Sequence, residues 1–164
     1  MNTANLTNSI SRNFIVQMIP HHRAAIEMSK NILCYTTFIP VQEIALGIIR
    51  EQTQSIRDME RIVRCCSRIK NSSQELSCYQ NKSREIMDIM FADMQNACTV
   101  NDINANFMYE MIPHHLGAVN MSQNALNFTL CADLKPILES IIASQQKGVQ
   151  EMEELLSQIN SYCI

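Results

Sequence analysis

Glycine, proline and long apolar runs are scarce in this sequence of 164 residues. It contains only 3 Gly and 4 Pro, which is too few for the many tight turns of a β-sandwich or β-barrel. No apolar run approaches the roughly 18 residues that a transmembrane helix needs. The N-terminal segment also lacks the basic start and apolar stretch of a signal peptide. We therefore expect a helical, cytoplasmic protein that has no membrane partner.

Charge and cysteine usage exclude further classes. The net charge of −3 gives no basic surface for nucleic acid. The 7 cysteines include no C-x-x-C pair, so a zinc knuckle or a thioredoxin-like motif has no support. In the cytoplasm they are expected to be reduced thiols. The adjacent Cys65 and Cys66 are either ligands for a soft metal or small apolar residues, and we favour the second interpretation.

A long internal repeat organises the chain. The segment Asn13–Leu33 recurs as Asn106–Leu126, at an offset of 93 residues. Across Arg12–Glu60 and Ala105–Glu153, 19 of the 49 aligned positions are identical. A period of this length indicates duplication of a two-helix unit and a two-fold bundle, and it argues against a solenoid of short repeats.

Each repeat unit is predicted to be an αα-hairpin. The hairpins cover about residues 10–68 and 103–160, and apolar residues follow a helical period in the second helix of each. In the first unit we expect helices over Ile10–Thr36 and Pro40–Arg68. The short connections within both units predict antiparallel packing.

A fifth helix is predicted between the two units, over about residues 73–98. It begins at a capping box formed by Ser72 and Glu75. In the second unit, Asp133 is the expected N-cap of the last helix, and Pro136 is tolerated in its first turn.

This connector decides the expected topology. Because it is as long as the other helices, the chain crosses the length of the bundle before the second hairpin begins, so the second hairpin runs in the opposite direction to the first. Residues 1–164 are predicted to form a single all-α domain. Its architecture is a ferritin-like up-down four-helix bundle, built from two duplicated αα-hairpins with a long helical crossover.

The two copies of the motif MIPHH contain every histidine of the chain. Each histidine pair shares a helical stripe with methionines, and imidazole and thioether groups together favour a soft ion such as Cu(I). The sequence leaves open whether the four imidazoles form one central site or two half-sites. The candidate metal ligands are Met18, His21, His22, Met28 and Met59 in the first unit, and Met111, His114, His115, Met121 and Met152 in the second.

Antiparallel pairing also predicts which residues lie at the same height in the first hairpin. It places His22 level with about Ser55, and Met18 level with Met59. A proline directly precedes each histidine pair inside the predicted helix, and we expect it to kink the helix and shape the site.

Each candidate also has a purely structural interpretation. Methionines on a helical stripe often fill a core, and buried histidines are often hydrogen-bonded core residues, for which Gln52 and Gln145 are natural partners. A further stripe of Met87, Met90 and Met94 on the connector is either a secondary Cu(I) relay or a flexible core strip, and we favour the core strip.

Enzymatic metal chemistry has little support in the sequence. A ferritin-like di-iron site needs Glu-x-x-His on two helices, and no acidic residue stands three positions before any histidine. No repeated carboxylate near the histidine pairs offers a general base for hydrolysis. The sequence therefore favours a protein that is not an enzyme.

The pattern MIPHH-x2-A-x2-M, read twice and followed each time by Gln-x6-Met, resembles domain-of-unknown-function family 305 over about Ser11–Leu156. The resemblance implies a ferritin-like bundle, mostly bacterial members, homo-oligomers, and copper binding by Met and His in some exported members. It adds Gln52 and Gln145 to the candidate residues. The sequence departs from the family at Ser55 and Gly148, where a Glu is usual, and it shows no export signal.

The leading hypothesis is a non-enzymatic metal-binding bundle that sequesters or delivers Cu(I) or Ag(I). Copper is the metal ion that we expect it to bind. The alternative is a structural or assembly module whose histidine pairs only make hydrogen bonds in the core.

Overall fold

Five helices make up most of the chain. The computed structural model describes residues 6–161, and the side chains of residues 6–159. No strand occurs in this range, and no helix in it is long and apolar enough to cross a membrane. The prediction of an all-α protein is confirmed. The helices are α1 (Ile10–Leu33), α2 (Ile39–Cys66), α3 (Ser73–Gln95), α4 (Ile103–Leu126) and α5 (Lys135–Ser161).

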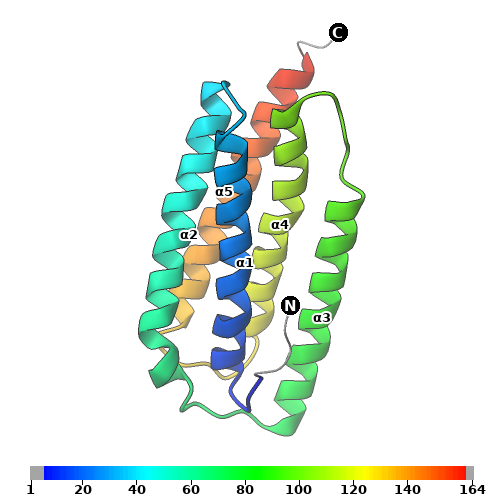
Figure 1. Ribbon diagram of the computed structural model, residues 1–164. Coiled ribbons are helices and arrows are strands. Elements are labelled where there is room, and N and C mark those ends of the chain that lie inside the picture. The colour runs from blue at the N-terminus through cyan, green and yellow to red at the C-terminus, as the bar shows by residue number, and fades with distance from the viewer. Residues whose placement is uncertain (1–5, 162–164) are drawn as a thin grey trace.

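The helices alternate in direction along the chain (Figure 1). Helix α1 rises, α2 descends, α3 rises, α4 descends and α5 rises. Helix α1 packs on α2 and α4 packs on α5, while α1 also contacts α4 and α2 contacts α5. Helix α3 packs along α4, outside this four-helix arrangement. The predicted ferritin-like bundle of two hairpins with a helical crossover is therefore the observed fold.

Side-chain hydrogen bonds fix where several helices begin and end. The predicted capping box of Ser72 and Glu75 is present at the start of α3. Helix α1 ends at Leu33, short of the predicted Thr36. The hydroxyl of Thr36 accepts a hydrogen bond from the backbone N–H of Phe38 at 3.1 Å, so it closes a turn instead of extending the helix.

The prediction that Asp133 caps α5 is wrong. Helix α5 begins at Lys135, and the backbone N–H of Leu138 donates to the carbonyl of Leu134 at 3.0 Å. Leu134 is therefore the residue that precedes the first turn, and burial of its side chain in the core accounts for the shift. Pro136 lies in the first turn, as predicted. The Asp133 carboxylate therefore does not cap α5.

The core consists of two apolar clusters, one in each half of the bundle. The lower cluster joins the N-terminal half of α1 to the C-terminal part of α2, the C-terminal part of α4 and the start of α5, with α3 against it. The upper cluster joins the opposite halves of α1, α2, α4 and α5. The level between the two clusters carries the two histidine pairs.

Candidate metal centre

A buried layer of polar side chains crosses the middle of the bundle. Each of its members is at most 4% exposed. The layer separates the two apolar clusters, because its residues lie between their members on α1, α2, α4 and α5. It consists of His21 and His22 on α1, Gln52 on α2, His114 and His115 on α4, and Gln145 on α5.

The two inner histidines meet between the hairpins. The rings of His21 and His114 are stacked, with centroids 3.8 Å apart and planes inclined by 29°. The outer rings are farther away: the centroid of His22 lies 6.2 Å from that of His21, and the centroid of His115 lies 6.5 Å from that of His114. In the described part of the chain, no three imidazole nitrogens lie within 4.8 Å of one another.

The imidazole nitrogens have few polar neighbours. The Nε2 atom of His22 lies 3.1 Å from Ser55 Oγ, which agrees with the height predicted for this pair. The Nε2 atom of His21 lies 3.3 Å from the sulfur of Met90 on α3. The Nδ1 atoms of all four histidines are buried without a hydrogen-bond partner. Such orphaned polar atoms are costly, at about 1–3 kcal/mol each.

The two glutamines do not complete the hydrogen bonding of the histidines. Both amide atoms of Gln52 are buried without a hydrogen-bond partner, as is Oε1 of Gln145. The expectation that His and Gln side chains satisfy one another in the core is therefore not what the structure shows. The layer instead presents unpartnered nitrogen and oxygen donors, which fits a group that would be bound between them.

Burial keeps these histidines uncharged at neutral pH. Loss of hydration lowers the pKa of His22 and of His115 to about 3, and the pKa of His114 to about 4. The pKa of His21 is also well below its usual value, because of burial first and then the neighbouring imidazoles. Neutral imidazoles hold a free lone pair for a metal ion without first losing a proton.

The six predicted methionines flank the polar layer in two symmetry-related groups. Five of them are at most 1% exposed, whereas Met28 is half-buried and lines a surface pocket of about 230 Å³. Within the described residues, none of these six sulfurs accepts a hydrogen bond from an imidazole. Met18, Met59 and Met121 belong to the lower cluster, and Met111 and Met152 belong to the upper cluster, with Met28 packed against it.

Met90 is the methionine that reaches a histidine, although sequence reasoning favoured a packing role for it. Its side chain lies over Gly117 on α4, where any Cβ atom would collide with the sulfur of Met90. The signal in the sequence was a difference between the repeats, because the first unit has Ala24 at the position of Gly117. Glycine inside a helix often marks the close approach of another group.

Two surface grooves between α2 and α5 lead toward the outer histidines. The larger, of about 400 Å³, includes Gly148 in its lining, and a Cβ atom at Gly148 would lie 3.1 Å from Nε2 of His115. The other, of about 320 Å³, includes Ser55, the partner of His22. Each outer histidine therefore lies directly beneath a small groove residue. The larger groove also carries the carboxylates Glu43, Glu51, Glu151 and Glu154.

Solved structures with a similar fold cover nearly the whole chain. CopM in the Ag-bound form is 24% identical in sequence, with a TM-score of 0.67, and the match covers 93% of this chain and 98% of that chain. CopM in the Cu(I)-bound form is also 24% identical, with a TM-score of 0.66 and coverages of 94% and 98%. A DUF305 fragment from Deinococcus radiodurans is 21% identical, with a TM-score of 0.67 and coverages of 91% and 96%.

No curated protein sequence matches this chain. A family match, in contrast, spans residues 8–156, which include both MIPHH motifs, all five helices except the end of α5, and every residue of the polar layer. The chain belongs to the family described as Domain of unknown function (DUF305).

Proposed function

We propose that the chain is a non-enzymatic metal-binding bundle that takes up a soft monovalent ion, Cu(I) or Ag(I), at the histidine layer. The observation that supports this most directly is the pairing of an imidazole nitrogen with a thioether sulfur. His21 Nε2 and Met90 Sδ lie 3.3 Å apart in a layer from which water is largely excluded. Thioether sulfur is a soft ligand that selects Cu(I) over the harder divalent ions.

The spacing of these two donors is compatible with binding one ion. With bonds of about 2.0 Å to nitrogen and about 2.3 Å to sulfur, a separation of 3.3 Å corresponds to an angle of about 100° at the ion. That angle is close to tetrahedral. The ring of His114, stacked 3.8 Å from that of His21, is the proposed source of a third donor.

The same layer is poorly suited to harder or higher-coordinate ions. No carboxylate belongs to it, and no three of its imidazole nitrogens are close together in the described chain. A catalytic Zn²⁺ site usually has three protein ligands in place, and Mg²⁺ and Ca²⁺ require oxygen ligands. Cu(I) and Ag(I) accept two or three ligands, so they match the donors that are present.

The similarity to CopM supports the same ion class. CopM structures have been solved in Ag-bound, Cu(I)-bound and Cu(II)-bound forms. At 24% identity the likeness establishes the fold, and the transfer of metal binding to this chain rests on its own histidine and methionine side chains. Copper is accordingly the ion that we propose it sequesters or delivers.

The grooves between α2 and α5 provide the proposed path of the ion from solvent. The larger groove reaches His115 at Gly148. It carries four glutamates, of which Glu51 and Glu151 pair with Arg50 and Lys147 of the same groove. The remaining negative charge attracts a cation toward the buried layer. His115 would then receive the ion first, and His114 and His21 would receive it deeper in the bundle.

A Cu(I) titration against a chromogenic chelator tests the function. It is best performed in a background with Cys65→Ser and Cys131→Ser, so that these two neighbouring thiols do not compete. We expect Met90→Leu to weaken binding by at least about tenfold, since it removes the sulfur and keeps the volume. Met87→Leu, one helical turn away on α3, is the matched control and should bind as the background does.

The alternative of a structural or assembly module makes the opposite prediction. It requires no metal uptake at stoichiometric levels, and it requires His21→Ala/His114→Ala to lose stability without any change in metal binding. If that double variant binds Cu(I) as tightly as the background protein, the histidine layer is not the site and the proposed function is wrong.

A further inference from the structure

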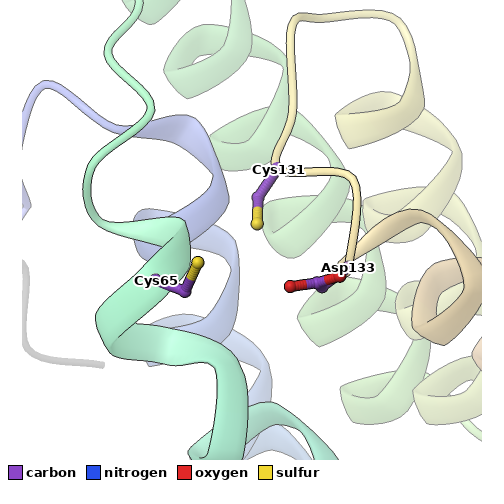
Figure 2. A group of neighbouring side chains, drawn as sticks. All are labelled: Cys65, Cys131 and Asp133. Atoms are coloured by element: carbon purple, nitrogen blue, oxygen red, sulfur yellow. The ribbon is translucent and has the colours of Figure 1, made fainter.

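Three cysteines and a carboxylate gather at the lower end of the bundle, remote from the histidine layer along α2. Cys65 and Cys66 are the last two residues of α2, and Cys131 and Asp133 belong to the connection between α4 and α5. The ligand atoms of Cys65, Cys131 and Asp133 all lie within 4.8 Å of one another. Figure 2 shows these three side chains directed toward a common point from the two segments.

The two segments are held in place by buried hydrogen bonds from the start of α1. The backbone N–H of Cys131 donates to Ser11 Oγ at 2.9 Å, and Ser9 Oγ donates to the carbonyl of Cys66 at 3.1 Å. Both serines are fully buried. The positions of the cysteine backbones are therefore fixed by a third element, as a preorganised ligand site requires.

Asn71 strengthens the same junction. Its Oδ1 atom accepts from the backbone N–H of Ile10 at 2.9 Å, and its Nδ2 atom donates to the carbonyl of Thr129 at 3.0 Å. The loop after α2, the start of α1 and the loop before α5 are thus tied together. Relative movement that would separate the cysteines requires breaking several of these bonds.

Cys66 provides a third sulfur at this junction. Its side chain is buried in the same apolar cluster as that of Cys131, and its sulfur lies outside the group of three ligand atoms. A thiol that coordinates a cation loses its proton to solvent.

We propose that this cluster is a second metal site, which binds Zn²⁺ through the thiolates of Cys65 and Cys131 and the carboxylate of Asp133, with a solvent water as the fourth ligand. Two sulfurs and two oxygens suit the tetrahedral preference of Zn²⁺. The carboxylate favours this borderline ion over Cu(I), for which thiolates alone suffice. Binding transfers the thiol protons to solvent and involves no change of oxidation state.

The observed spacing needs little adjustment to bind the ion. Tetrahedral Zn²⁺ with bonds of about 2.3 Å to sulfur holds its sulfur ligands about 3.8 Å apart. The ligand atoms of Cys65, Cys131 and Asp133 are at most 4.8 Å apart, so contraction by about 1 Å through side-chain rotation completes the site. Cys65 and Asp133 are exposed, which gives the ion direct access from solvent.

Titration of the reduced protein with Co²⁺ and Zn²⁺ tests this site. Co²⁺ reports thiolate ligands by sulfur-to-metal charge-transfer absorption, and Zn²⁺ measures affinity against a chromophoric chelator. We expect one equivalent to bind with thiolate absorption, and Cys65→Ser to weaken Zn²⁺ binding by at least about tenfold. Because Cys65 is exposed, this substitution leaves folding intact. Cys78→Ser, an exposed cysteine on α3, is the matched control and should bind normally.

Two further variants distinguish this site from a site without the carboxylate and from the histidine layer. Asp133→Asn should also weaken Zn²⁺ binding by about tenfold, whereas an unchanged Zn²⁺ affinity would remove the carboxylate from the proposal. His21→Ala/His114→Ala should keep Zn²⁺ binding, so failure of the proposed copper function is distinguishable from failure here. The proposal is overturned if Cys65→Ser binds Zn²⁺ as wild type does, or if the cysteines form a disulfide and the reduced protein takes up no Zn²⁺.

Discussion

Acidification tests the buried histidine layer through the stability of the metal-free protein. The folded protein holds the pKa of each of its four histidines below the usual value of 6.5. The unfolded chain therefore binds more protons than the folded one as the pH falls below 6.5, and the free energy of unfolding decreases. This loss continues until the pH reaches the folded pKa values of about 3 to 4, and it reverses on return to neutral pH.

The magnitude follows from the same values. At pH 5.5 each histidine that is neutral when folded costs about 1.4 kcal/mol, so the four together cost about 5–6 kcal/mol relative to pH 7.5. This approaches the whole stability of a small domain, which is about 5–15 kcal/mol. Carboxylates contribute little in this window, because their usual pKa values lie near 4.

Urea unfolding at pH 7.5 and at pH 5.5, followed by circular dichroism with a chelator present, measures the difference. A matched variant, His22→Gln, should reduce the loss by about one quarter, since it removes one of four titrating groups. Equal stability at the two pH values would refute the reasoning, because the histidines would then accept protons in the folded state as easily as in the unfolded chain.

The remaining predictions concern packing and capping. Gly117→Ala should destabilise the fold by about 1–2 kcal/mol in thermal or urea unfolding and weaken Cu(I) binding, because the new methyl displaces Met90. Gly47→Ala is its control: with no atom within 4 Å of the new methyl, it should stabilise α2 by about 0.5–1 kcal/mol, and a loss instead would contradict the helix-propensity argument. Ser9→Ala should cost about 1–2 kcal/mol, since it removes the cap of α1 and one of the two hydrogen bonds to the Cys66 carbonyl; an unchanged denaturation midpoint would count against this.

The fold could be predicted from the sequence because two independent patterns agree. The helical periodicity indicates the helices, and the repeat indicates two equivalent hairpins. The predicted height of His22 beside Ser55 matches the 3.1 Å contact, since helix length and antiparallel pairing alone determine it. The predicted cap at Asp133 failed because burial of Leu134 overrides a local capping preference. The predicted compartment, kinks at the prolines and homo-oligomers stay predictions.

The candidate sites were only partly accessible, because their details depend on contacts between distant segments. The choice between one site and two half-sites depended on the ring orientations, which place His21 against His114. The position of Met90 depended on which helix of the bundle α3 packs against, and the structure places α3 along α4. The sequence favoured an apolar role for Cys65 for the same reason, since Cys65 and Cys131 are brought together by the end of α2 and the connection between α4 and α5. Cys163 lies outside the described residues.

The connector makes two duplicated halves chemically unequal. Duplication places equivalent imidazoles and methionines on both hairpins, but α3 packs along α4 and delivers Met90 to His21 alone. The outer histidines differ as well, because Ser55 offers a hydroxyl to His22 where Gly148 leaves His115 against a groove. The first unit thus has an additional thioether beside its inner histidine, and the second has a groove beside its outer histidine. Under the proposed function, this asymmetry predicts that the ion enters beside His115 and is held beside His21, and therefore that each chain binds one ion.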